Sequence, residues 1–308
     1  MEYNFYTTDV FTNTQFGGNP LAVFPEAAGL SDEQMQLIAR EFNLSETIFM
    51  FPPEDAAHTY KVRIFTPNHE LPFAGHPTVG GAYVLATMGF IKLDGAVTEI
   101  VFEEGVGPVP IKIFADDAGN VAKAELSAAV IPEIMQGAPS AEALEQVLSL
   151  DSGDVLSEGL SPVGGPSPVI VKAGTPRLFA PVKDRAALGR ISIDAALWRK
   201  HLGDTRSIYV FCTDPELEDS DLRGRMFVGP ASGLYEDPAT GSAVTALAAY
   251  LATLSDIKNG TLRWVMEQGF EMGRPSILEM EADLVDGASQ AIRVAGSSVM
   301  VSKGTFFV

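Results

Sequence analysis

The sequence is short of cysteine, of basic residues and of long apolar runs, and each shortage excludes a class of protein. Cys212 is the single cysteine, so neither a disulfide framework nor a cysteine-based zinc site can be built, and we expect a reducing compartment. Only 21 lysines and arginines stand against 40 acidic residues, a net charge of −19 that argues against nucleic acid and anionic membranes as partners. No apolar run reaches about 18 residues. No basic segment followed by an apolar one opens the chain, so we predict a cytoplasmic protein without a signal peptide or membrane span.

The remaining composition is that of an ordinary globular protein. Apolar residues make up 46% of the 308 and charged residues 20%, enough for one large domain or two of common size. Strand and helix patterns alternate irregularly. Ser31 to Phe42 predicts an amphipathic helix, because Ser31 is a good N-cap and apolar residues follow at helical spacing.

Short stretches of the first half recur in the second half in the same order. The matches pair Gly18-Asn19-Pro20 with Gly174-Thr175-Pro176, Glu46-Thr47-Ile48 with Arg206-Ser207-Ile208, Arg63-Ile64-Phe65 with Arg225-Met226-Phe227, His76-Pro77 with Asp237-Pro238, and Glu104-Gly105 with Gln268-Gly269. Their sequence offsets lie between 156 and 164 residues. Nearly constant offsets indicate a tandem duplication.

The duplication predicts an α+β fold made of two pseudo-symmetric halves. Each half contains several strands, one amphipathic helix and one helix that is apolar nearly all round, and such a helix is buried. We therefore expect each half to be a β barrel or strongly curved sheet around a central helix. The halves are expected to span residues 1–130 and 131–308, with a boundary near 128–139 and a last strand that can return to the first half.

Both apolar helices are predicted to follow a histidine or aspartate and a proline. The first is expected to begin at Pro77 with His76 as its N-cap, and Asp237 is expected to cap the second. Glycines and small residues after the prolines would let a carboxylate or phosphate approach the free N–H groups of the first turn. Pseudo-twofold halves would then bring His76 and Asp237 face to face across a cleft.

Each candidate also has a plain structural explanation. Asp237 is a good helix cap, and capping alone accounts for it. A lone histidine such as His76 is more often a structural residue, although its pairing with Asp237 in the repeat favours a functional role. Glu46 precedes an apolar strand, where partial burial would raise the pKa of its carboxyl group, as suits a general acid or base. A surface charge at the strand edge is the alternative.

Two other enzyme classes are disfavoured by spacing. His69-Glu70 begins like a zinc-binding helix motif, but no second histidine follows at the required spacing, and Pro72 prevents a helix up to His76. The Gly17-Gly18 and Gly80-Gly81 pairs lack the three-glycine spacing and the acidic residue of a dinucleotide-binding fingerprint.

The chain resembles the PhzF-like phenazine-biosynthesis isomerase family along essentially its whole length. The stretches that carry the resemblance are FGGNPLAVF (16–24), NLSET (43–47), RIFTPNHELPFAGHPTVG (63–80), EDPATGSA (236–243) and QGFEMGRPS (268–276). The resemblance implies the diaminopimelate epimerase fold, with an active site between two β-barrel halves. Diaminopimelate epimerase itself uses a cysteine from each half, whereas this chain has Gly75-His76 and Glu236-Asp237 there, which excludes a two-thiol racemase.

The resemblance also implies residue roles and a reaction. Glu46 would shuttle a proton, with His76 and Asp237 as its catalytic partners, and Gly241 and Ser242 would hold a substrate carboxylate. The remaining substrate-binding residues are expected to be Asn19, Ser45, Gly75 and Thr240. The expected reaction is isomerisation of a small cyclic or unsaturated carboxylic acid, such as 2,3-dihydro-3-hydroxyanthranilate. It would need no metal and no organic cofactor, and a homodimer is expected.

Two further functions stay open on the sequence alone. Glu46 and His76 could serve a racemase or dehydratase acting on an amino-acid-like substrate. The second possible function is binding of a small ligand without catalysis. The presence of Glu46, His76 and Asp237 together speaks against this second function.

Overall fold

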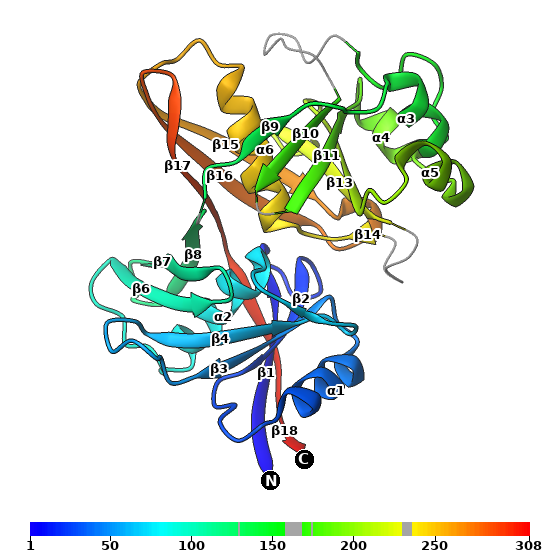
Figure 1. The fold of residues 1–308 in the computed structure, drawn as a ribbon. Coiled ribbons are helices and arrows are strands. Elements are labelled where there is room, and N and C mark those ends of the chain that lie inside the picture. The colour runs from blue at the N-terminus through cyan, green and yellow to red at the C-terminus, as the bar shows by residue number, and fades with distance from the viewer. Residues whose placement is uncertain (129, 158–167, 174, 230–235) are drawn as a thin grey trace. The chain divides into compact units, whose positions relative to one another are not determined.

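The computed structural model describes residues 1–128, 130–157, 168–173, 175–229 and 236–308. The chain divides into two compact units (Figure 1). Unit 1 contains Met1–Ala129 and Arg293–Val308, and unit 2 contains Val130–Ile292. Strand β17 (Ala288–Gly296) begins in unit 2 and ends in unit 1.

Unit 1 is a curved sheet with two helices. Neighbouring strands run in the order β18-β1-β2-β3-β4-β6-β7-β8, and β8 also pairs with the end of β17. The β2–β3 and β4–β6 pairs are parallel, and the others are antiparallel. The elements are β1 (Glu2–Val10), β2 (Asn19–Phe24), α1 (Asp32–Phe42), β3 (Glu46–Phe51), β4 (Tyr60–Phe65), β5 (Glu70–Leu71), α2 (Gly75–Thr87), β6 (Val97–Glu104), β7 (Gly107–Ala115), β8 (Val121–Ser127) and β18 (Ser298–Phe307).

Unit 2 repeats this plan with more helices. Its strands run in the order β9-β10-β11-β12-β13-β15-β16, and β11–β12 and β13–β15 are parallel. The elements are β9 (Glu133–Met135), α3 (Ala141–Leu148), β10 (Val169–Ala173), β11 (Thr175–Pro181), α4 (Arg185–Arg190), α5 (Ala195–Leu202), β12 (Ser207–Cys212), β13 (Leu222–Val228), β14 (Glu236–Asp237), α6 (Gly241–Thr253), β15 (Gly260–Gln268), the short 3₁₀ helix η1 (Phe270–Met272) and β16 (Ser276–Val285).

The predicted amphipathic helix of the first half is confirmed as α1. Ser31 accepts a hydrogen bond from the backbone N–H of Gln34, and the Gln34 side chain accepts one from the Ser31 N–H, which completes a capping box. The expectation of one such helix in each half is wrong for unit 2. There α3, α4 and α5 pack on an apolar cluster that includes Leu144, Leu188 and Trp198.

A buried helix lies in the curve of each sheet, which confirms the α+β class. Helix α2 packs against β1, β2, β3, β7 and β8, and α6 packs against β10, β11, β15 and β16 (Figure 1). Their predicted starts are wrong. Helix α2 begins at Gly75 after the N-cap Ala74, so His76 and Pro77 are its second and third residues. Helix α6 begins at Gly241 after the N-cap Thr240, and Asp237 lies upstream in β14.

The strand register also corrects the repeat. Phe65 pairs with Glu70 as Phe227 pairs with Glu236, and both buried helices have 13 residues. From Glu70/Glu236 to the ends of the two buried helices the offset is therefore 166, because the β13–β14 connection is four residues longer than the β4–β5 connection. His76 then corresponds to Ser242 and Asp237 to Leu71, so His76 and Asp237 are not repeat equivalents. Gly174, part of the proposed repeat, lies outside the described residues.

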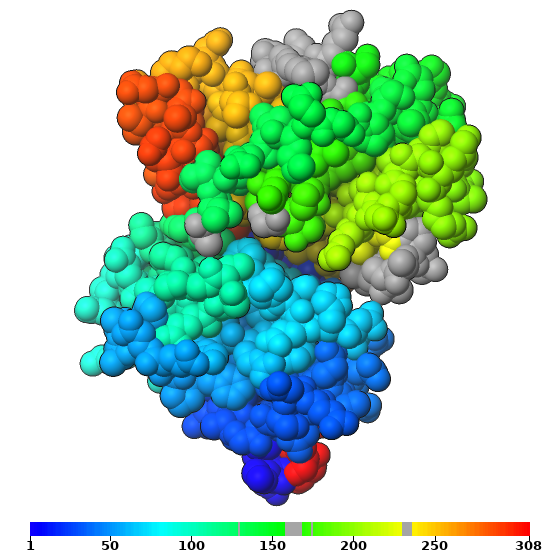
Figure 2. Space-filling view, in the orientation of Figure 1, coloured from blue at the N-terminus to red at the C-terminus, as the bar shows by residue number. Residues whose placement is uncertain are grey.

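The first and last strands of the chain are neighbours in unit 1. Strand β1 pairs along its whole length with β18, from Glu2 opposite Phe307 to Val10 opposite Ser298. In Figure 2 the dark blue first residues and the red last residues accordingly lie against each other. Among the helices of the described residues, none has the length and apolar character needed to cross a membrane.

Candidate functional site

In unit 1 the predicted site residues stand at the starts of three neighbouring elements. Asn19 is the fully buried first residue of β2. Ser45 directly precedes Glu46, the first residue of β3, and β3 runs parallel to β2 with Glu46 beside Leu21. Gly75 and His76 open α2. Because parallel strands begin at the same edge of a sheet, the fold brings these five residues to one edge of unit 1.

Glu46 and His76 are in contact. The imidazole Nδ1 lies 3.3 Å from the carboxylate Oε2 of Glu46, and the two side chains are 5% and 17% exposed. Burial lowers the pKa of His76 to about 3, although a hydrogen bond with the backbone of Pro20 acts in the opposite direction. The imidazole is therefore neutral at neutral pH, so the contact with Glu46 is not an ion pair between two charged groups.

The second imidazole nitrogen is available to a ligand. Nε2 of His76 is buried and has no hydrogen-bond partner among the described residues. If Nδ1 carries the proton, Nε2 keeps a lone pair that can accept a hydrogen bond. If the carboxyl group of Glu46 carries the proton and donates it to Nδ1, Nε2 becomes a donor. The imidazole can therefore present either a donor or an acceptor to a ligand while it stays neutral itself.

A second buried carboxyl group lies beneath the first turn of α2. The hydroxyl of Thr78 lies 2.6 Å from Oε1 of Glu104, the last residue of β6, and 2.8 Å from the carbonyl oxygen of Ala74. Burial raises the pKa of Glu104 to about 8, against the opposing hydrogen bond with Thr78. Its Oε2 has no partner among the described residues.

In unit 2 the corresponding helix start is fixed by an amide. Gln268, the last residue of β15, is fully buried. Its Oε1 accepts hydrogen bonds from the Tyr209 hydroxyl (3.0 Å) and the Thr240 N–H (3.1 Å). Its Nε2 donates to the Asp237 carbonyl (2.7 Å) and to the Thr240 hydroxyl (3.0 Å). Since all four hydrogen-bonding positions of the amide are used, Gln268 can hold the segment from Asp237 to Thr240 in a single orientation.

Asp237 belongs to the same cluster. Its carboxylate accepts a hydrogen bond from the hydroxyl of Thr240. Burial, together with the negative charge of Asp237, raises the pKa of Tyr209 well above its usual value, so the phenol stays protonated and donates to Gln268. Asp237 and Thr240 are therefore brought together as predicted site residues.

The start of α6 has features of an anion site. Its first two residues, Gly241 and Ser242, have first-turn N–H groups with no acceptor within the helix, at the positive end of the helix dipole. The guanidinium of Arg177 on β11 donates a hydrogen bond of 2.7 Å to the hydroxyl of Ser242. A positive side chain thus adds to the dipole at the place where the sequence predicts a carboxylate.

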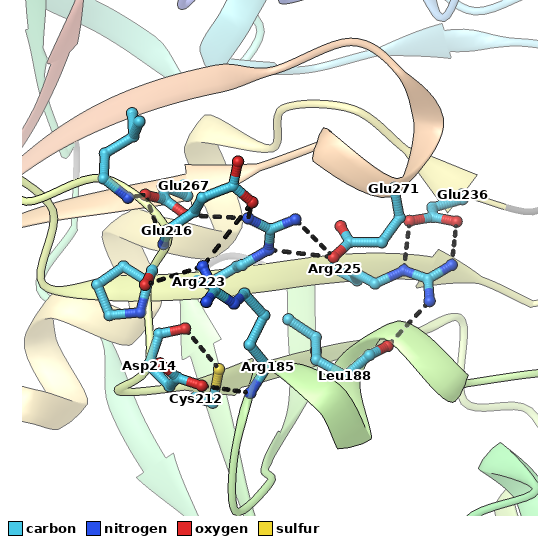
Figure 3. Close-up of polar contacts among 12 residues, drawn as sticks. Arg185, Leu188, Cys212, Asp214, Glu216, Arg223, Arg225, Glu236, Glu267 and Glu271 are labelled. Carbon is cyan, nitrogen blue, oxygen red and sulfur yellow. Dashed lines mark hydrogen bonds and ion pairs between the residues drawn. The ribbon is translucent and has the colours of Figure 1, made fainter.

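Strand β14, which carries Asp237, is anchored by an arginine–glutamate pair (Figure 3). Arg225 on β13 donates two hydrogen bonds of 2.8 Å to the carboxylate of Glu236 and one of 3.0 Å to the carbonyl of Leu188. Its guanidinium also lies over the ring of Phe227. Unit 1 has the same device, because Arg63 binds Glu70 of β5 with two 2.7 Å hydrogen bonds. Bidentate pairs of this kind fix strand geometry as well as charge.

The cysteine is not part of either cluster. Cys212 is buried at the end of β12 beside Asp214 (Figure 3), and burial raises the pKa of its thiol to about 11. A neutral thiol is a poor nucleophile, in keeping with the exclusion of thiol chemistry from the sequence.

Two other features carry no support for a site. No group of three histidine, cysteine or acidic side chains within the described residues could hold a metal ion. An open groove of about 1200 Å³ in unit 1 is lined by charged side chains that include Lys61, Arg63 and Glu70. These groups already pair with one another or with neighbours, and the lining includes neither Glu46 nor His76.

Sequence reasoning assigned no supporting role to Thr78, Arg177 or Tyr209, although all three lie in stretches that carry the repeat or the family resemblance. Glu104 and Gln268 are members of the repeat, and Gln268 also begins one of the stretches that carry the family resemblance. Because they hold equivalent positions in the two halves, the repeat was the one signal that could have assigned them a role.

Comparison with known proteins identifies the family. The sequence model of the family described as "Phenazine biosynthesis-like protein" matches residues 8–304. An uncharacterized isomerase of Mesorhizobium japonicum is 38% identical, with 99% of each chain covered. The trans-2,3-dihydro-3-hydroxyanthranilate isomerase of Pseudomonas aeruginosa is 32% identical over 99% of this chain and 100% of its own.

A solved structure agrees with the sequence matches. The phenazine biosynthesis protein of the PhzF family from Bacillus anthracis superposes with a TM-score of 0.86, at 26% identity and with both chains fully covered. The family match over nearly the whole length, the isomerase relatives and the shared fold lead to one conclusion. The chain belongs to the phenazine biosynthesis-like protein family, and it is an isomerase.

Proposed function

We propose that this isomerase moves a proton between two carbons of a small cyclic or unsaturated carboxylic acid, without a metal or organic cofactor. The contact between Glu46 and His76 carries the proposal, since it sets a carboxyl group beside a buried neutral imidazole with an open nitrogen. The name of the Pseudomonas aeruginosa relative suggests a substrate that resembles 2,3-dihydro-3-hydroxyanthranilate.

In the proposed reaction Glu46 removes a proton from a carbon that an adjacent π system makes acidic. The electron pair of the broken C–H bond moves into the π system, and Glu46, now protonated, returns the proton to a different carbon of the same molecule. No oxidant or reductant is needed, because the atoms and electrons of product and substrate are the same. His76, neutral on both sides of the reaction, can hydrogen-bond a substrate heteroatom through Nε2 as charge develops.

We assign the unit 2 cluster to substrate binding in the same reaction. The α6 start at Gly241 and Ser242, with Arg177 beside it, suits the substrate carboxylate. Asp237 would accept a hydrogen bond from a substrate N–H or O–H group, in an orientation set by Thr240. That Glu46, His76 and Asp237 act on one substrate stays a prediction, as do the homodimer and the cytoplasmic location.

The test follows carbon-bound hydrogen. The purified protein is incubated in D₂O with 2,3-dihydro-3-hydroxyanthranilate and a panel of small unsaturated carboxylates, and proton NMR records product formation and hydrogen exchange. Glu46→Gln keeps the shape of the side chain but cannot act as a base, so turnover and exchange should fall by a factor on the order of 10² or more. Asp55→Asn, which changes an exposed carboxylate of unit 1, is the matched control.

Each result has a definite meaning. Exchange that depends on Glu46 supports the proposal and begins to rank substrates. Full turnover in Glu46→Gln would falsify the role of Glu46. Product with inverted configuration at one carbon, and no migration of hydrogen, would favour the racemase alternative.

A further inference from the structure

The hydrogen bonds around the carboxyl group of Glu104 favour its protonated form. The hydroxyl of Thr78 has a single hydrogen, yet it lies within hydrogen-bonding distance of two oxygens, the Ala74 carbonyl at 2.8 Å and Glu104 Oε1 at 2.6 Å. A carbonyl oxygen can only accept. Both contacts are satisfied together when Glu104 is a neutral acid that donates to Thr78, while Thr78 donates to Ala74.

The other half of the molecule contains a neutral group at the same place. Strand β6 lies parallel to β4 as β15 lies parallel to β13. The residues before the two strand ends act alike, because Glu103 accepts the N–H groups of Glu54 and Asp55, and Glu267 accepts those of Glu216 and Leu217. Glu104 and Gln268 are therefore equivalent.

Glutamine is close in shape to a protonated glutamate and is a donor that carries no charge. Gln268 donates from Nε2 to the hydroxyl of Thr240, at the start of α6. A neutral Glu104 donates in the same sense to the hydroxyl of Thr78, in the first turn of α2. The two halves thus support their buried helices with an uncharged donor at the end of equivalent strands.

We propose that Glu104 is a positioning residue that works as a neutral acid: through Thr78 it fixes the first turn of α2, and with it Gly75 and His76, and loss of its proton sets the alkaline limit of the isomerase. This extends the proposed function, because His76 is the group that Glu104 holds in place. Once ionised, Glu104 would draw the Thr78 hydrogen away from Ala74. It would also place an uncompensated charge in a buried site.

Few ionisable groups near Glu104 could produce the alkaline limit of activity in its place. Strand alternation directs Lys61, Arg63, Glu103 and Lys112 toward the face of the sheet opposite Glu104. On the same side, β3 offers Glu46, β4 offers Tyr60, and α2 carries His76 and Tyr83. Glu104 also lines the open groove of unit 1, together with His58 and Glu70. Burial raises the pKa of Tyr60 and lowers that of His76 to about 3, so neither titrates near pH 8. The pKa of Glu104 itself, raised to about 8 by burial, falls in the range where activity should be lost.

The protonation state can be measured without a substrate. Infrared difference spectra of the whole protein, recorded during a titration from pH 6 to pH 10, should show loss of a protonated-carboxyl band near pH 8. The band should be absent from Glu104→Gln. If it persists in Glu104→Gln, or if Glu104 is ionised at pH 6, the proposal is overturned.

The positioning role is tested by a comparison of variants. Glu104→Leu should lower kcat on the order of tenfold or more with little change in KM, and Glu104→Gln should rescue most of that loss and shift the alkaline limit to higher pH. Thr78→Ser should behave like the wild type, and Thr78→Val like Glu104→Leu. An alkaline limit that is unchanged in Glu104→Gln, or a kcat as low as that of Glu104→Leu, would contradict the proposal.

Failure of the proposed reaction can be recognised separately. If neither the wild type nor any variant exchanges hydrogen, the isomerisation proposal fails, whereas the infrared titration and the thermal stability of Glu104→Gln still decide the state of Glu104. A melting temperature of Glu104→Gln that rises relative to the wild type between pH 5 and pH 8 supports a neutral Glu104. No such rise contradicts it.

Discussion

His76 should make the protein sensitive to mild acid, and the size of the effect can be worked out. The pKa of its imidazole is about 3 in the folded chain, against 6.5 as the unperturbed value. Below pH 6.5 the unfolded chain therefore binds a proton that the folded chain excludes, so stability falls as the pH drops. Linkage between pH 7.5 and pH 5 gives a loss of about 2 kcal/mol from this residue alone. His76→Gln, which cannot titrate, should avoid this loss.

The measurement is urea denaturation of wild type and His76→Gln at the two pH values. All other titrating groups are shared, so the difference between the two pH-dependent losses isolates His76. His69→Gln removes an exposed imidazole from the same unit and should follow the wild type. Equal losses in the wild type and His76→Gln would show that the folded chain holds a charged or hydrated His76, and the neutral imidazole of the proposed mechanism would be refuted.

Two further predictions concern the scaffold. Arg225→Met leaves the carboxylate of Glu236 largely buried without its bidentate partner and should cost about 3 kcal/mol of unfolding free energy. Arg263→Met, at an arginine that is 68% exposed beside Glu281, should cost less than about 1 kcal/mol, and equal costs would contradict the role of burial. Gly80→Ala should destabilise by about 1–3 kcal/mol, because its Cβ would lie 2.5 Å from Val10 Cγ2 and 2.7 Å from Leu21 Cδ2. Gly189→Ala in α4, where an added Cβ would meet no atom within 4 Å beyond the backbone of its own helix and its chain neighbours, should be neutral or stabilising in the same thermal melts.

Features that depend on local chemistry could be predicted from the sequence. The helix after Ser31 has its whole capping signal within four residues. The two buried helices are apolar on every face, so no partner is needed to recognise them. The site residues Glu46 and His76 were found from the repeat and the family resemblance, and the structure places them in contact.

Features that depend on strand register could not be predicted from the sequence. The sequences around Pro77 and Pro238 look alike, but Pro77 lies inside α2 and Pro238 lies before α6. The extra residues between β13 and β14 shift the repeat, and this becomes visible only when Phe65–Glu70 and Phe227–Glu236 are seen as equivalent pairs. The role of Glu104 could not be predicted for the same reason, because no residue pattern near Glu104 in the sequence indicates its contact with Thr78.

The pairing of β1 with β18 has a consequence for how the chain folds during synthesis. Residues near the two ends, such as Tyr3 and Phe306, must meet across about the whole length of the described chain, and such distant contacts form slowly. Unit 2 is encoded entirely between the two segments of unit 1. On the ribosome unit 2 can therefore complete its fold first, while one edge of β1 stays unpaired until β18, which follows unit 2 in the chain, has been translated. A truncation at residue 129 would for the same reason yield an aggregation-prone half, whereas a circular permutant that joins residues 308 and 1 would make unit 1 continuous.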